Sequence, residues 1–215
     1  MAISKSGEPL DVSTTLSRVD ISPYLIHFTS GENYEDAFKR LHKIIDDRKL
    51  LAGTRYVKGK YACVCFSEAP LPTLPHGLVN EEYYSRYSPF GIVVSKQWLF
   101  AKGGRPVIYE SAQEYNALSE SHRWRHVLYE VRENFSYSDF TWEREWRIKC
   151  DYLEFDETSA KIVVPDRAWA ERLVAEHHRE QDYVVAQYAL IFDHTIAEAH
   201  RETFGWTILA LKTGR

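Results

Sequence analysis

The sequence lacks any run of 18 consecutive apolar residues, and residues 1–20 contain no apolar segment of the kind that secretory signal peptides carry. We therefore expect neither a membrane span nor a signal peptide. Cysteine is also scarce. Of the three present, Cys63, Cys65 and Cys150, the first two stand two residues apart, which is a poor spacing for a mutual disulfide. We expect free thiols and a cytoplasmic location.

Neither sign of charge dominates the composition. The 27 basic and 31 acidic residues give a formal net charge of −4, which predicts no overall attraction to nucleic acid or to an anionic membrane. Of the 215 residues, 44% are hydrophobic, which is enough for a sizeable core. We place a polar N-terminal arm at residues 1–20 and a single domain at residues 21–215.

Short apolar runs separated by turn residues predict seven strands. They cover residues 24–29, 61–66, 90–94, 105–109, 140–148, 161–164 and 206–211. Helical spacing of apolar residues predicts helices capped by Asn33, Ser95 and Asp166, the first of them ending near Gly53. The remaining segments are assigned as helix over residues 111–125 and 195–204, and as either strand or helix over residues 183–192.

The order of these elements indicates the fold class. Strands and helices do not alternate regularly, as they would in a doubly wound parallel fold. The sequence therefore predicts a single α+β domain with a central mixed or antiparallel, split β-sheet flanked by helices.

The segment FTWEREWRI, residues 140–148, carries unusual charge for a strand. Side chains two residues apart share a strand face, so Glu143, Glu145 and Arg147 are expected on one side and Trp146 and Ile148 on the other. The charged face is either a solvated Glu-Arg ladder or part of a site. Two carboxylates on a rigid strand suit a pair of tasks: one stabilises a cationic transition state, and the other takes a proton from a nucleophile. Arg147 would keep them ionised.

Three short motifs resemble the three-part pattern of the ADP-ribosyltransferase fold. They are His27-Phe28-Thr29 at the end of the first strand, Phe66-Ser67-Glu68 at the end of a middle strand, and Glu143-Arg144-Glu145 on a late strand. The first block, residues 24–53, also resembles the opening of DarT-type DNA ADP-ribosyltransferases, in which a His-x-Thr strand is followed by a helix, a glycine and an arginine. That arginine corresponds to Arg55.

The resemblance implies NAD as co-substrate and a role for each matching residue. His27 and Thr29 would hold one end of NAD, and Arg55 would bind a phosphate oxygen. Glu145 would be catalytic, with Glu143 orienting or deprotonating the acceptor. Three further residues would line the NAD site, with either phenylalanine stacking on nicotinamide: Phe28, Phe66 and Ser67.

Over nearly its whole length, the chain more distantly resembles AbiGi-like proteins of bacterial abortive-infection systems, through the blocks CFSEAPL, GGRPVIY and DFTWEREWRI. This implies a toxin or effector in anti-phage defence that transfers ADP-ribose to a macromolecule, with nucleic acid slightly favoured over protein. The basic residues that could contact a polyanion, or simply be solvated, are Arg55, Lys58, Lys60, Arg86, Arg123 and Arg125.

Other functions stay open. The chain could be a non-catalytic antitoxin or immunity protein that masks a cognate toxin, or a toxin that a cognate antitoxin masks. A nuclease would bind Mg²⁺ through Asp139, Glu143 and Glu145, but it lacks the Glu-x-Lys that such sites often use. A zinc site built on Cys63 and Cys65 lacks the usual spacing, so we assign no metal.

Overall fold

The computed structural model describes residues 21–68, 87–131 and 137–212. Its largest element is a seven-stranded sheet with the order β13-β12-β4-β1-β3-β10-β5. The bounds of its strands are β1 Tyr24–Phe28, β3 Cys63–Ser67, β4 Gly91–Ser95, β5 Arg105–Pro106, β10 Glu145–Lys149, β12 Ala160–Asp166 and β13 Ile208–Lys212. Neighbouring strands are antiparallel except β12 and β13, which are parallel. The predicted α+β class, single domain and mixed sheet are confirmed, whereas the arm at residues 1–20 lies outside the described residues.

Within the described residues, four helices accompany the sheet: α2 Tyr34–Asp47, α3 Lys96–Ala101, α4 Arg167–Tyr188 and α5 His194–Glu198. The N-caps predicted for the first three are confirmed, because the side chains of Asn33, Ser95 and Asp166 each accept a hydrogen bond from a backbone N–H of the first turn. Helix α2 ends earlier than predicted. Arg48, not Gly53, takes the left-handed conformation (φ 50°) that turns the chain into the next strand.

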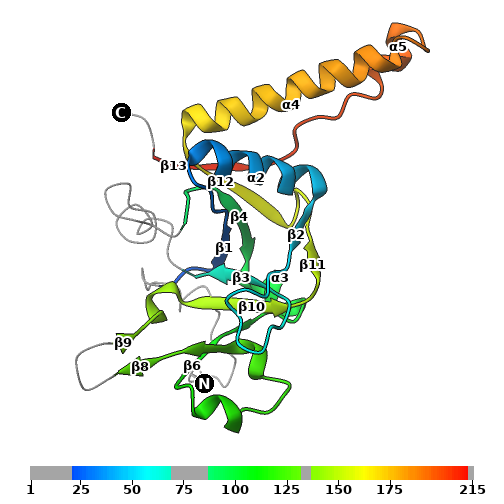
Figure 1. Ribbon diagram of the computed structural model, residues 1–215. Helices are drawn as coiled ribbons and strands as arrows, with labels where there is room; N and C mark the ends of the chain where they lie inside the picture. The colour runs from blue at the N-terminus through cyan, green and yellow to red at the C-terminus, as the bar shows by residue number, and fades with distance from the viewer. Residues whose placement is uncertain (1–20, 69–86, 132–136, 213–215) are drawn as a thin grey trace, which may run out of the picture.

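The described part of the chain also forms three two-stranded sheets. They pair β2 Lys49–Leu51 with β11 Tyr152–Glu154, β6 Ile108–Glu110 with β7 His126–Leu128, and β8 Glu130–Val131 with β9 Tyr137–Ser138. In Figure 1, α2 and α4 lie at the top of the molecule, while β6, β8 and β9 lie at the bottom.

One helix prediction was wrong, and a second was correct in place but too long. Residues 111–125 form no α-helix, only the 3-10 turns Glu114–Ala117 and Arg123–Arg125, because Trp124 is the one buried side chain in these turns and a polar segment gains little from packing. Residues 195–204 are helical only to Glu198, after which the chain extends towards β13. Residues 183–192, predicted as either strand or helix, are helical as far as Tyr188, where α4 ends.

The two faces of the sheet have different surroundings. Side chains alternate along each strand, so Leu25, Val64 and Ile148 pack against α2 and α4 in the main core. Ile26 and Phe28 point to the opposite face, where they form a smaller cluster with residues of β4 and β12. One face is therefore filled by helices, and the other is where a site can form.

No helix in the described part of the chain has the length and apolar character needed to cross a membrane.

Candidate functional site

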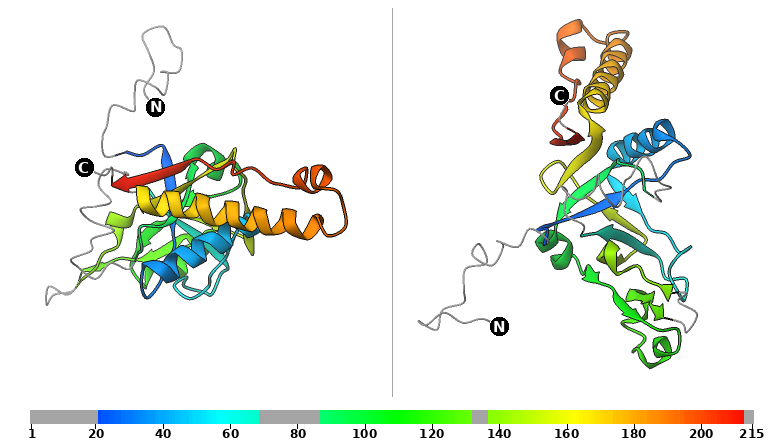
Figure 2. Two further views of the ribbon diagram at one scale, coloured as in Figure 1. Left: turned by 90° about the horizontal axis from the view of Figure 1, so that it is seen from above. Right: turned by 90° about the vertical axis from the view of Figure 1, so that its left-hand side faces the viewer.

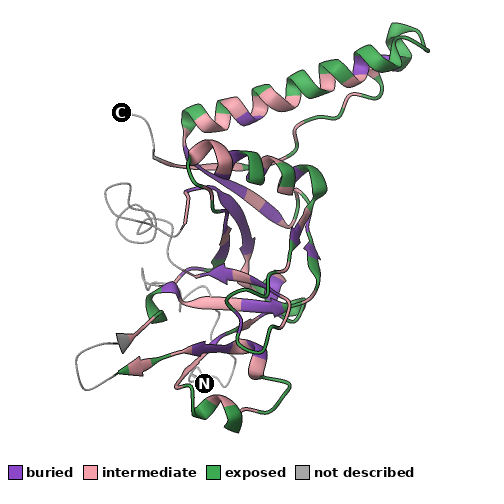
Figure 3. Ribbon diagram, viewed as in Figure 1, coloured by how far each residue is buried: buried purple, intermediate pink, exposed green. Residues whose placement is uncertain are grey.

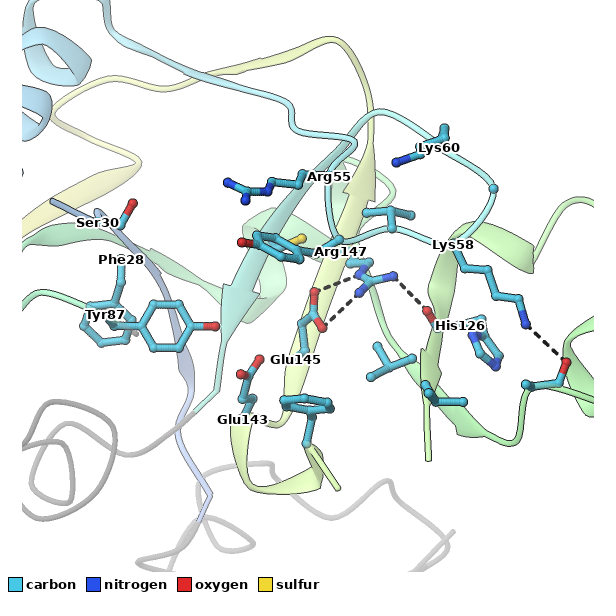
Figure 4. A pocket seen from close by; sticks show the side chains of 18 of the residues that line it. Phe28, Ser30, Arg55, Lys58, Lys60, Tyr87, His126, Glu143, Glu145 and Arg147 are labelled. Atoms are coloured by element: carbon cyan, nitrogen blue, oxygen red, sulfur yellow. Dashed lines mark hydrogen bonds and ion pairs between the residues drawn. The ribbon is translucent and has the colours of Figure 1, made fainter. Parts of the chain in front are cut away.

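A pocket of about 1070 Å³ lies between β1, the loop that follows β2, the β7 region and the start of β10 (Figure 4). Ligand pockets usually measure roughly 300–1,000 Å³, so this one is large enough for a dinucleotide. Its acidic and basic lining residues are Glu32, Arg40, Arg55, Lys58, Lys60, Glu143, Glu145 and Arg147.

The floor of the pocket is a buried ion pair between Glu145 and Arg147, which are adjacent on one face of β10. Arg147 Nε donates to Glu145 Oε1 at 2.7 Å and Nη2 donates to Oε2 at 3.1 Å, a two-point contact that fixes the carboxylate plane. The side chain of Arg147 is 4% exposed and that of Glu145 is 11% exposed. Figure 4 shows the paired carboxylate directed into the pocket.

Arg147 is also bound to the part of the chain that carries β7. Its Nη1 donates to the backbone carbonyls of Trp124 at 3.1 Å and His126 at 2.9 Å. Burial lowers the pKa of Arg147, but the charge of Glu145 and its hydrogen bonds outweigh that effect and raise the pKa above its ordinary value. The guanidinium therefore stays charged, and it joins the main sheet to the small β6–β7 sheet.

Glu143 reaches the same pocket by a different route from the one predicted. Residues 140–148 were expected to be one strand, but Thr141–Glu143 form a 3-10 turn and Arg144 is left-handed at φ 44°. The Asp139 side chain causes the turn by accepting hydrogen bonds from the backbone N–H and the hydroxyl of Thr141. The predicted facing was right for Glu145 and Arg147, which lie in β10, and wrong for Glu143, which is not in a strand.

Two hydroxyl groups hold this turn against the sheet. Ser67 Oγ, buried at the end of β3, donates to the carbonyl oxygen of Glu143 at 2.7 Å. The Tyr109 hydroxyl accepts from the backbone N–H of Glu145 at 3.1 Å and donates to the carbonyl of Phe140 at 3.2 Å. Burial raises the pKa of Tyr109 to about 12, so this hydroxyl keeps its proton at neutral pH. Both carboxylates are thereby positioned by groups outside their own segment.

The rim of the pocket is basic. Arg55, Lys58 and Lys60 lie in the loop between β2 and β3, whose Val57 is buried against Trp124 and Cys63. Lys58 is held by the carbonyl of Ala112 at 3.1 Å. In the described part of the chain, the Arg55 guanidinium makes no ion pair, and Figure 4 shows it extending over the pocket.

Arg40 is a further rim residue that sequence reasoning missed. It lies on α2, and its Nη1 donates to Ser30 Oγ at 3.2 Å. Nothing in the sequence marks it, because helix spacing places it on a solvated face and only the fold brings that face to the pocket. Tyr87, which precedes β4, also lines the pocket and was also missed, because only the fold brings it beside Phe28.

The structure brings together four of the eight predicted site residues and separates the others. Those that line the pocket are Phe28, Arg55, Glu143 and Glu145, while Ser67 lies beneath it. His27, Thr29 and Phe66 are not among the lining residues, because alternation along β1 and β3 places them on the helix-covered face.

Each residue on that face has a structural partner. His27 Nδ1 donates to the carbonyl of Cys65 at 2.8 Å, and its ring meets Phe66 edge to face. Burial lowers the pKa of His27, and the bond to Cys65 partly opposes this. Thr29 Oγ1 donates to the backbone carbonyls of Ala37 at 3.3 Å and Phe90 at 3.2 Å, which fixes α2 to the sheet.

The remaining sequence candidates have these positions. Cys63, Cys65 and Cys150 are free thiols, and burial raises the pKa of Cys63 to about 11.

Among the described residues, potential metal ligands gather at His42, Asp46 and Glu180, between α2 and α4 and outside the pocket lining. Arg123 and Arg125 donate to backbone carbonyls and do not line the pocket, and Arg86 lies outside the described residues.

The site thus combines a pair of acidic side chains on a rigid floor with cations at its mouth. Setting the Glu145–Arg147 pair aside, four cations (Arg40, Arg55, Lys58, Lys60) face two carboxylates (Glu32, Glu143). Such a pocket suits an anionic ligand that develops positive charge near its buried end. Comparison with protein-family models, curated proteins and solved structures gave no match.

We expect Arg147→Met to lower the free energy of unfolding by about 3–5 kcal/mol, because it leaves the Glu145 carboxylate buried without its counter-charge. The double variant Glu145→Leu/Arg147→Met should lose less than the single variant, because no buried charge is left unpaired. The measurement is urea denaturation followed by circular dichroism.

The control is Lys43→Met, which breaks the exposed Lys43–Asp47 pair (2.9 Å) and should cost less than about 1 kcal/mol. If Arg147→Met were no more destabilising than Lys43→Met, the ion pair would not be the structural floor of the pocket.

Proposed function

We propose that the protein is an NAD-dependent ADP-ribosyltransferase, with an ADP-ribosyltransferase-like fold, that transfers ADP-ribose to a macromolecule. The observation that carries this proposal is the placement of Glu143 and Glu145 at the bottom of a large pocket whose mouth carries Arg40 and Arg55. Arg40 and Arg55 are exposed, whereas Glu143 is buried and the Glu145 side chain is 11% exposed, an arrangement that suits a dinucleotide entering with its reactive ribose first.

The cations at the mouth would bind the diphosphate. Arg55 and Arg40 approach the pocket from different elements, the loop after β2 and helix α2, so they can contact phosphate oxygens from two directions. Phe28 and Tyr87, whose rings lie 5.6 Å apart on the pocket wall, offer an aromatic surface for a flat base or nicotinamide ring.

Glu145 would stabilise the reacting sugar. Breaking the bond between nicotinamide and ribose leaves an oxocarbenium-like centre, and a fixed carboxylate beside the ribose hydroxyl groups lowers the energy of that cation. The two-point contact with Arg147 holds the carboxylate still, so it need not reorganise during the reaction.

Glu143 would accept the proton of the incoming nucleophile as the new bond to ribose forms. It stands at the end of a 3-10 turn next to the floor residue, so the two carboxylates approach the same ligand from separate segments. Glycosyl transfer requires these two roles, because one group stabilises the sugar cation and the other accepts the proton of the acceptor.

A macromolecular acceptor is favoured by the surface around the mouth. Lys58 and Lys60 extend the basic rim away from the floor along an exposed loop, which suits the backbone of a nucleic acid more than a neutral small molecule. We place this activity in anti-phage defence, as a toxin or effector. A protein that only masks a partner would have no need for buried carboxylates in a deep pocket.

We expect Glu145→Gln to reduce transfer of labelled ADP-ribose from NAD by about 100-fold or more, because the neutral amide cannot stabilise the cation. Glu143→Gln should lower the rate of transfer while leaving NAD binding nearly unchanged. The measurement is incorporation of label into bacterial nucleic acid and protein fractions, together with growth inhibition when the gene is induced.

Glu154→Gln is the matched control, because Glu154 is an exposed glutamate on β11. If Glu145→Gln, folded as judged by circular dichroism, labels its acceptor as well as the Glu154→Gln control does, Glu145 is not the catalytic residue. A wild-type protein that transfers no label from NAD and does not inhibit growth would overturn the transferase proposal itself.

A change at the rim should affect binding instead of chemistry. We expect Arg55→Gln to raise KM for NAD about tenfold with little change in kcat, because the lost phosphate contact is present in both the ground state and the transition state. Steady-state kinetics provide the measurement, with Arg167→Gln on the exposed start of α4 as the control. An unchanged KM would exclude a role for Arg55 in holding NAD.

A further inference from the structure

The distal half of α4 leaves the body of the protein and ends in an exposed hairpin with α5 (Figures 1 and 2). The first half of α4 is anchored, since Leu173 is buried and Trp169 packs against the main core. In the second half, Val185 is the one buried residue, and α5 contributes the buried Ala197. In this subsection, residues 183–201 are called the arm; they are distinct from the N-terminal residues 1–20.

The arm is mostly exposed (Figure 3), and several of its exposed residues have large apolar side chains. Their exposed fractions are Tyr183 66%, Tyr188 37%, Leu190 78%, Ile191 79%, Phe192 42% and Ile196 46%. At about 200 Å² for each large side chain, these fractions amount to roughly 700 Å². The largest apolar patch on a typical monomer is about 300–600 Å², so the summed exposure of these six side chains reaches the size of such a patch.

The charged side chains beside the patch are paired within the arm and its base. Arg201 donates to Asp182 at 2.8 Å and to both carboxylate oxygens of Glu198, at 2.8 and 3.2 Å. Asp193 is used as the N-cap of α5, where its carboxylate accepts hydrogen bonds from backbone N–H groups. The border of the patch therefore carries one arginine and three carboxylates, whereas the patch itself is made of apolar and aromatic side chains.

We propose that the arm is the contact through which two copies of this chain form a dimer. A two-fold axis brings the same surface of two identical copies together, and an apolar patch can meet its own copy because its side chains need no oppositely charged partner. Two patches of roughly 700 Å² give about 1,400 Å² of buried surface, within the usual range of about 1,200–2,000 Å² for specific interfaces.

The shape of the molecule permits this pairing. The arm extends past the sheet and past α2, so two arms can lie together while the two bodies stay apart (Figure 2). The pocket is lined by residues of the body and by none of the arm, so each copy would keep its own site open. This inference does not rest on the proposed transferase activity.

The test is the mass of the purified full-length chain by sedimentation equilibrium over a range of concentrations. We expect the wild type to dimerise, and Leu190→Asp and Ile191→Asp each to raise the dimer dissociation constant at least about tenfold, because a carboxylate would be buried opposite an apolar surface. Tyr183→Ser, a milder change on α4, should weaken the dimer in the same direction.

Leu51→Asp is the matched control, since Leu51 is an equally exposed leucine (66%) on β2, outside the arm, and its change should leave the dimer intact. A wild-type chain that stays monomeric up to about 100 µM would overturn the proposal and leave the patch to a different protein. A dimer that persists unchanged in the folded Leu190→Asp and Ile191→Asp variants would overturn it equally.

Discussion

The buried ion pair between Arg147 and Glu145 is the contact on which the rest of the site depends. Two charges removed from water are costly, and their attraction offsets this cost only when geometry is good and the other hydrogen-bonding groups are satisfied. Here the guanidinium meets both carboxylate oxygens and two backbone carbonyls. Because those carbonyls belong to the segment that carries β7, one side chain sets the position of the catalytic candidate, the floor of the pocket and the docking of a second small sheet.

The pocket exists because the two faces of the sheet have different neighbours. Helices α2 and α4 cover one face with apolar and aromatic side chains, including Phe38 and Trp169. These two rings and that of Phe90, which precedes β4, lie within about 6 Å of one another. The other face carries Phe28, Cys65, Glu145 and Arg147, and none of the helices in the described residues covers it. A strand that alternates Trp146 and Ile148 with Glu145 and Arg147 serves both faces, which explains why a buried strand carries so much charge.

Much of the fold could be predicted because it depends on local signals. Asn33, Ser95 and Asp166 are N-cap residues followed by helical spacing, and the alternation in β10 placed Glu145 beside Arg147. The turn at Glu143 was missed because Asp139 and Thr141 compete locally with strand pairing, a signal that the charged residues after it obscured. Arg40 and Tyr109 could not be found in this way, since their places in the site depend on contacts between elements far apart in the sequence. Alternation also separates His27 from Phe28, although the two are neighbours in one motif.

The most direct test is the position of a bound ligand. A crystal structure of the protein with a slowly reacting NAD analogue would show which face of the sheet the dinucleotide occupies. We predict the nicotinamide ribose within hydrogen-bonding distance of the Glu145 carboxylate and the diphosphate against Arg55. An analogue seated on the helix-covered face beside His27, or a pocket that binds no analogue at saturating concentration, would contradict the assignment of this pocket as the NAD site.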